Sequence, residues 1–134
     1  EIAIKYGSLL CERILEPIQE HFGRISIRSG YRSPEINALG AENKNQYRCA
    51  SNTRNNSKHI WDYPSPLGYY GAMACIVIPS YLDYYNNTGD WVSLKNQLVN
   101  IATEFSSMTF YPQLCAVNIS WSELPQRKIK SHIR

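Results

Sequence analysis

The sequence lacks any apolar run approaching the ~20 residues that a membrane-spanning helix requires, so membrane insertion is not expected. None of its four cysteines stands in the Cys-x-x-Cys spacing of a structural zinc knuckle. The net charge of +3 is too small to indicate nucleic-acid binding by itself, and no nucleic-acid partner is expected. These absences argue against an integral membrane protein, a zinc-knuckle protein and a protein with a strongly basic surface.

Internal repeats and linkers are absent as well, which leaves one domain over residues 1–134. Hydrophobic residues make up 43% of the chain and charged residues 19%, a balance typical of a folded chain with a buried core. We expect the core within about 9–121 and a solvated basic tail at 125–134.

Apolar periodicity predicts two long helices. The first covers 8–22, with Pro17 expected to kink it. The second begins after Asp90, which is expected to be its N-cap. Shorter helices are expected near 33–40 and 81–85. The apolar positions that define the two long helices are Leu10, Ile14, Ile18 and Phe22, and Trp91, Leu94, Leu98, Ile101 and Phe105.

Four segments have strand patterns, at 24–29, 74–78, 108–111 and 116–121. In the last one, Val117, Ile119 and Trp121 share one face, and Asn118 and Ser120 share the other. Residues 41–56 read as a polar loop and 60–70 as an ordered aromatic loop. The order of helices and strands predicts an α+β fold, with helices packed on a mainly antiparallel sheet.

Four motifs occur in a fixed order along the chain. They are Ser29-Gly30-Tyr31-Arg32-Ser33, Ser57-x-His59, Gly71-Ala72-Met73-Ala74-Cys75, and a late strand that carries Asn118. This ordered set resembles the zinc D-Ala-D-Ala carboxypeptidase family, which includes D-Ala-D-Ala dipeptidases and the L-alanyl-D-glutamate endolysins of phages. The resemblance implies the peptidase fold that is also seen in the signalling domain of Hedgehog proteins. It further implies a zinc ion held by His, Asp and His, and an arginine, here Arg32, that binds the substrate carbonyl.

The sequence departs from that family at the positions that carry its chemistry. Cys75 stands at the position of the Asp ligand, and Asn118 at the position of the second His ligand. Cys115 replaces the carboxylate that serves as the family's acid and base. An insertion within 60–70 also lengthens the separation between His59 and Cys75. We therefore expect the fold to be retained and the activity to be altered.

Three interpretations of the altered site stay open. In the first, the site binds no metal, so that no cofactor is needed. In the second, His59 and Cys75 hold zinc atypically, because Asn118 is a poor zinc ligand and Cys115 should lie on the opposite strand face. In the third, Cys75, His59 and Asn118 form a thiol-based catalytic site, with Arg32 adding positive charge.

The residues expected to bind a substrate lie in the first motif, beside His59 and in the aromatic loop. They are Arg32, Ser57, Trp61, Tyr63 and Tyr70. The competing interpretation of the aromatic residues is that they attach the loop to the body of the domain. His21 and His132 are expected to be exposed and unrelated to the site.

We therefore predict a catalytically altered peptidase-like domain that acts as a binding or structural module. The resemblance implies an association with the cell wall, with peptidoglycan peptide or other protein subunits as partners. A bacterial cytoplasmic protein and a phage virion or tail component are the expected settings. The alternative is an active cell-wall peptide amidase or peptidase with an atypical metal site or a Cys75–His59 thiol site.

Overall fold

The computed structural model describes residues 2–31, 60–62 and 64–134. The helices are α1 (Ile2–Leu10), the π-helical turn η1 (Cys11–Leu15), α2 (Glu16–Phe22), α4 (Pro79–Thr88), α5 (Trp91–Ile101) and the 3-10 turn η2 (Gln113–Cys115). The strands are β1 (Ser26–Ser29), β2 (Gly71–Val77), β3 (Ser107–Phe110), β4 (Val117–Ser122) and β5 (Lys128–Ser131). Of the helices in these ranges, none combines the length and the apolar character needed to cross a membrane.

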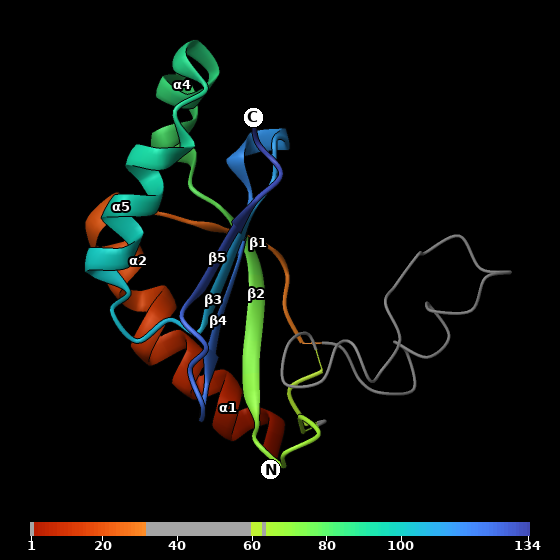
Figure 1. The fold of residues 1–134 in the computed structure, drawn as a ribbon. Helices are drawn as coiled ribbons and strands as arrows, with labels where there is room; N and C mark the ends of the chain where they lie inside the picture. The colour runs from red at the N-terminus through yellow and green to blue at the C-terminus, as the bar shows by residue number, and fades with distance from the viewer. Residues whose placement is uncertain (1, 32–59, 63) are drawn as a thin grey trace, which may run out of the picture.

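The strands form one five-stranded sheet in the order β1-β2-β4-β3-β5 (Figure 1). Three neighbouring pairs are antiparallel, and the β3–β5 pair is parallel. Figure 1 shows α1, α2 and α5 on one side of the sheet, with α4 beyond its end. The predicted α+β fold in a single domain is therefore confirmed, and the sheet is mixed, with antiparallel pairs in the majority.

The hydrophobic core lies between the sheet and the helices. Alternate residues of each central strand point into it, as the side-chain period of a strand requires. The core residues of the strands are Ala72, Ala74, Ile76, Met108, Phe110, Val117 and Ile119, and those of the helices include Leu10, Ile14, Ile18, Leu94 and Leu98. The intervening residues of the same strands therefore share the opposite face of the sheet.

The predicted helix 8–22 begins earlier, at Ile2, and has a wide turn at its centre. In that turn the N–H of Glu16 donates to the carbonyl of Cys11, five residues earlier. Pro17 follows at once, in the first turn of α2. A proline ring collides with the carbonyl four residues before it, and the widened turn relieves that collision. The kink expected at Pro17 is thus a π-helical turn.

The second long helix is built as predicted. Asp90 is the N-cap of α5, because its Oδ1 accepts a hydrogen bond of 3.0 Å from the N–H of Ser93. The preceding helix α4 is longer than the predicted 81–85. It begins at Pro79, where a proline needs no N–H partner, and ends at Gly89 with a φ of 67°.

The alternation of Ile25 and Ile27 with polar residues in the predicted strand 24–29 would bury both on one face. Ile25 packs against the core, but Ile27 in β1 is 57% exposed. Strand β1 is an edge strand, and its register with β2 shifts between Ile27 and Ser29. The alternation rule assumes that one face is covered, and at this edge it is not.

The tail at 125–134 is exposed over most of its length, as expected, but the expectation that the folded core ends at about 121 is wrong. Residues Lys128–Ser131 form strand β5, which pairs with β3 from Ser107↔Lys128 to Phe110↔Ser131. Ile133, further on, packs against the core. The folded body therefore extends past residue 121, because backbone pairing accepts side chains that are exposed and basic.

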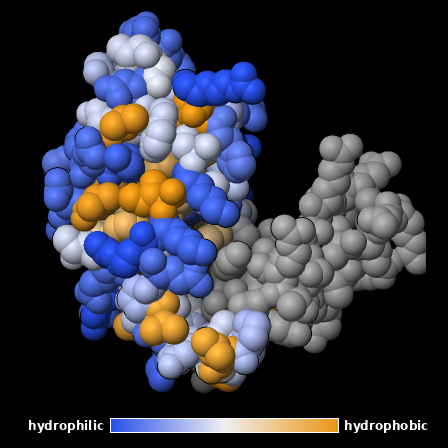
Figure 2. Space-filling model, in the orientation of Figure 1, coloured by the Kyte–Doolittle hydropathy of each residue, from blue (hydrophilic) through white to orange (hydrophobic). Residues whose placement is uncertain are grey.

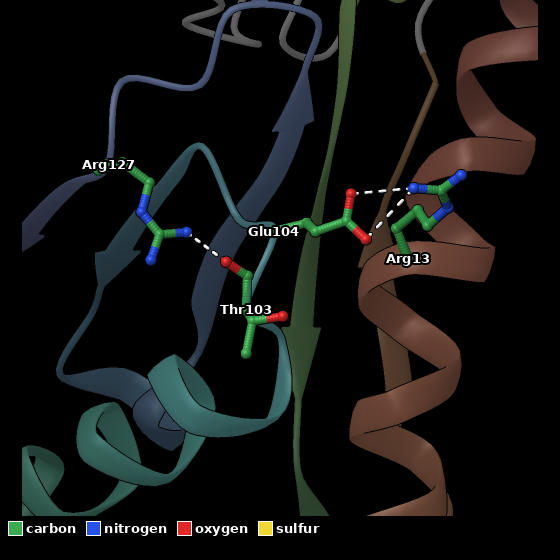
Figure 3. Close-up of polar contacts among 4 residues, drawn as sticks. All are labelled: Arg13, Thr103, Glu104 and Arg127. Carbon is green, nitrogen blue, oxygen red and sulfur yellow. Dashed lines mark hydrogen bonds and ion pairs between the residues drawn. The ribbon is translucent and has the colours of Figure 1, made fainter.

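Polar contacts hold the loop after α5 in place (Figure 3). Arg13 forms a salt bridge of 2.9 Å with Glu104. Arg127 donates to the carbonyl oxygens of Thr103 and Phe105, and its guanidinium lies 4.2 Å from the centre of the Phe105 ring. These contacts of Arg127 fix the chain just before β5 begins.

Candidate functional site

Cys75 and Asn118 lie opposite each other on neighbouring strands. The register of β2 and β4 pairs them directly. Both belong to the sheet face that points away from the helices, since Ala74 and Val117 beside them lie in the core. Directly paired residues of antiparallel strands have Cα atoms about 4.5 to 5.5 Å apart. The structure thus brings together two of the residues that the sequence analysis selected.

Three further side chains complete this group, which we call the Cys75 cluster: Cys75, Asn118, Tyr111, His132 and Arg28. The amide nitrogen of Asn118 donates to the hydroxyl of Tyr111 at 3.2 Å. The ring of His132 stacks on Tyr111 with a centroid distance of 5.2 Å and an angle of 24°. His132 is exposed, as expected. It was not expected near the site, but its ring contacts Tyr111, which is bonded to Asn118.

The thiol of Cys75 is half buried, and its pKa reflects two opposing effects. Burial raises the pKa, and the nearby Arg28 guanidinium lowers it, with a net upward shift. The thiol therefore carries its proton at neutral pH. The pKa of Tyr111 is raised by burial and by Cys75, against a lowering by its hydrogen bond with Asn118. Within the described residues, Cys75 thus lacks the depressed pKa that a thiol nucleophile requires.

Cys115 lies away from this cluster. It is 4% exposed, has a φ of 50°, and sits in η2, which packs against α4. Burial and the charge of Asp90 raise its pKa to about 11. Strand β4 begins at Val117, so the position three residues before Asn118 lies in a left-handed turn and faces the helices. Cys115 and Cys75 are both free thiols and form no disulfide with each other.

Four of the predicted site residues lie outside the described residues: Arg32, Ser57, His59 and Tyr63. In the ranges 2–31, 60–62 and 64–134, no group of three or more His, Cys, Asp or Glu side chains is arranged to hold a metal ion.

Trp61 and Tyr70 pack against the body of the domain. The Trp61 ring lies against Gly7, and its Nε1 donates to the carbonyl of Met73 at 3.2 Å. The Tyr70 ring is stacked on Tyr6, with a centroid distance of 5.2 Å and an angle of 8°. These contacts agree with the interpretation that the aromatic residues attach the loop to the domain. Neither side chain is among those that surround Cys75.

Comparisons of the chain with protein-family models, with curated proteins and with solved structures found no match. The resemblance to the zinc D-Ala-D-Ala carboxypeptidase family therefore stays a prediction from the sequence motifs.

Proposed function

We propose that this protein is a catalytically altered domain of the D-Ala-D-Ala carboxypeptidase type, which binds peptide without hydrolysing it. The observation that carries this proposal is the pairing of Cys75 with Asn118. These residues stand where the resemblance expects an Asp and a His ligand. Their pairing on one sheet face is what a retained framework with exchanged ligands would produce.

The donors in the described part of the site do not fit the zinc centre that the resemblance implies. Zinc in proteins is bound by thiolate, imidazole or carboxylate groups. Asn118 offers a neutral amide that is engaged with Tyr111, and the described residues hold no group of three or more His, Cys, Asp or Glu side chains that could bind a metal ion. The raised pKa of Cys75 counts against the alternative of a thiol hydrolase. At the position of the family's acid and base the chain has Cys115, which is buried on the helix side and offers no carboxylate to activate water.

The Cys75 cluster is instead suited to binding. Arg28 supplies a positive charge beside it, and Asn118 and Tyr111 supply a linked pair of polar groups on a half-buried surface. Carboxylates and amides of a peptide are natural partners for such groups. With the family resemblance, this favours peptidoglycan peptide as the ligand and a cell-wall or phage virion setting. Binding to other protein subunits is the second form of the same proposal.

The experiment is to incubate the protein with a purified peptidoglycan stem peptide, and to measure binding by calorimetry and peptide integrity by mass spectrometry. The proposal predicts saturable binding with an intact peptide, and weaker binding by the Arg28→Gln variant. Lys95→Gln, a cation on α5, is the matched control. Cleavage that disappears in Cys75→Ser would instead establish a thiol hydrolase, and cleavage that a chelator stops would establish an atypical metal site.

A further inference from the structure

A second polar site lies on the same sheet face, two residues along the strands from Cys75. There, Met73 pairs with Ser120, Ser120 with Ser107, and Ser107 with Lys128. A hollow of about 150 Å³ lies over this row, which we call the serine trough. Its lining residues include Ser106, Ser107, Ser120, Ser122, Lys128 and Lys130.

Two hydroxyl groups of the serine trough each accept one hydrogen bond from the backbone and donate none among the described residues. Ser106 Oγ accepts from the N–H of Gln126, and Ser122 Oγ accepts from the N–H of Leu124. A hydroxyl carries one hydrogen that it can donate. Among the described residues no acceptor bonds to either of these two hydroxyl hydrogens.

The floor of the trough adds a third free donor. Ser107 Oγ and Ser120 Oγ share one hydrogen bond of 2.6 Å, which uses the hydrogen of only one of the two hydroxyls. Ser120 and Ser106 are each only 4% exposed, so these hydroxyls belong to the interior of the fold. Each of these hydroxyls has a hydrogen-bond partner among the described residues and keeps capacity for a further bond to a ligand in the hollow.

The charges around the trough have one sign. Lys128 and Lys130 line it from β5, and neither forms a salt bridge within the described part of the chain. No carboxylate is among its described lining residues. Hydroxyl and ammonium donors that converge without a carboxylate favour an anionic ligand.

We propose that the serine trough binds a phosphoryl group. Its donors come from three strands and surround the hollow, an arrangement that suits a tetrahedral oxyanion better than a planar carboxylate. The described residues that line the trough include no arginine, whose planar fork matches carboxylates, whereas lysine binds phosphate as a point charge. A volume of about 150 Å³ corresponds to roughly five water molecules, which is enough for one phosphoryl group.

This inference does not depend on the proposed function. Cys75 and Asn118 are not among the residues that line the trough. A failure of peptide binding at the Cys75 cluster would therefore not count against phosphate binding in the serine trough. A failure of phosphate binding would likewise not count against peptide binding. Two separate experiments can overturn the two proposals one at a time.

The test is a titration of the whole chain with inorganic phosphate, followed by backbone amide NMR at constant ionic strength in chloride. Saturable shifts are expected at the amides of Ser106, Ser107, Ser120 and Lys128. Lys128→Gln/Lys130→Gln should weaken phosphate binding by about tenfold or more, as loss of charge-assisted hydrogen bonds would do. Lys95→Gln, which removes one positive charge from α5, should leave it unchanged.

Two further arms separate a built site from general electrostatic attraction. Ser122→Ala removes one donor at the rim without changing any charge, and should also weaken phosphate binding. Acetate, a planar anion, should bind distinctly more weakly than phosphate or glycerol 3-phosphate. Equal binding of acetate would contradict the phosphoryl assignment, and shifts that spread over all basic residues or persist in the lysine variant would overturn the site itself.

Discussion

At the scale of single residues, Gly7 in α1 is required by its contact with Trp61. A Cβ added at Gly7 would lie 2.3 Å from Cζ3 of the indole ring, which is closer than atoms can approach. Glycine in a helix normally costs stability relative to alanine, so this position retains glycine against helix propensity. The close contact allows the indole to reach the carbonyl of Met73 on β2.

Gly7→Ala should therefore destabilise the protein by roughly 1 to 3 kcal/mol, because overpacking exceeds the gain in helix propensity. Urea unfolding measures the effect, and Ser8→Ala on the exposed side of α1 should be nearly neutral or slightly stabilising. In a Trp61→Ala background the sign should reverse, and Gly7→Ala should become stabilising. The same loss of stability in both backgrounds would contradict the contact.

The reactivity of Cys75 provides a second prediction at this scale. Since burial raises the pKa of its thiol, alkylation of Cys75 should be slow at neutral pH and should accelerate only above the ordinary value of 9.0. The rate of iodoacetamide labelling against pH measures this in a variant whose other three cysteines are replaced. Arg28→Gln should move the midpoint higher, because that guanidinium lowers the pKa. A midpoint below about pH 8 would instead indicate an activated thiolate.

The members of the Cys75 cluster differ in how far the sequence could reveal them. Cys75 and Asn118 lie in strands with clear patterns, so motif order was enough to place them on facing positions. Tyr111 and His132 come from the end of β3 and from just beyond β5. They meet only because β5 pairs in parallel with β3, and no local pattern encodes that pairing. For Cys115 the sequence supplied only its position relative to the family's acid and base. The left-handed φ that sets the direction of its side chain has no signal in the sequence.

At the scale of elements, one carboxylate joins α1, the start of β2 and the end of β4. Glu123 accepts a hydrogen bond of 2.7 Å from the hydroxyl of Tyr6 and one of 2.8 Å from the N–H of Tyr70. These bonds lower the pKa of Glu123, the N–H of Tyr70 having the larger effect. Burial, with the bond to Glu123, raises the pKa of Tyr6 to about 12.

The sign of the resulting pH dependence follows from these directions. The stabilisation by Glu123 is present above the pKa of the unfolded chain and is lost as pH falls through the lowered pKa of the folded state. The stabilisation by Tyr6 is present below its ordinary pKa of 10.0 and is lost as pH rises through about 12. Together, Glu123 and Tyr6 therefore stabilise the fold at neutral pH, and this stabilisation decreases at both low and high pH.

Glu123→Gln should lower the free energy of unfolding at pH 7 and flatten its decline between neutral and acid pH. Urea unfolding at a series of pH values measures both effects. Glu20→Gln, at an exposed position of α2, controls for the change in charge. An acid dependence as steep in Glu123→Gln as in the wild type would show that this carboxylate does not link the three elements.

Helices and strands with strong apolar patterns lie close to their predicted positions. Elements that depend on backbone pairing with a distant strand were not predicted. Helix α5 and strands β2 and β4 lie close to their predicted positions, because an N-cap and apolar periodicity mark them locally. Strand β5 has no such mark, since its basic residues point to solvent and only its backbone pairs with β3. The proline at position 17 predicts a kink in the helix, but it does not predict that the kink is a π-helical turn, which depends on the backbone geometry.

At the scale of the whole molecule, helices cover one face of the sheet and polar groups occupy the other. Figure 2 shows apolar residues in separate small patches among polar ones on the side in view. The Cys75 cluster and the serine trough lie on the sheet face that points away from the helices, next to each other along the strands. We infer that this face is the functional surface, with a peptide site and a phosphoryl site side by side.

The α+β fold could be predicted because helix and strand periods determine it. The peptidase fold that we propose is supported by the motif order and by the Cys75–Asn118 pairing. If the pairing descends from a metal site, restoring both ligands should restore metal binding. Catalysis should still be absent, because Cys115 is buried among the helices and offers no carboxylate.

The most direct test of this account is zinc stoichiometry by elemental analysis of wild type and Cys75→Asp/Asn118→His. We expect no stoichiometric zinc in the wild type and about one zinc per chain in the double variant, since Asp and His are good ligands. Cys75→Asp/Ser122→His, with the histidine four residues further along β4, is the matched control and should bind none. One zinc in the wild type, or none in the double variant, would contradict a peptidase framework with exchanged ligands.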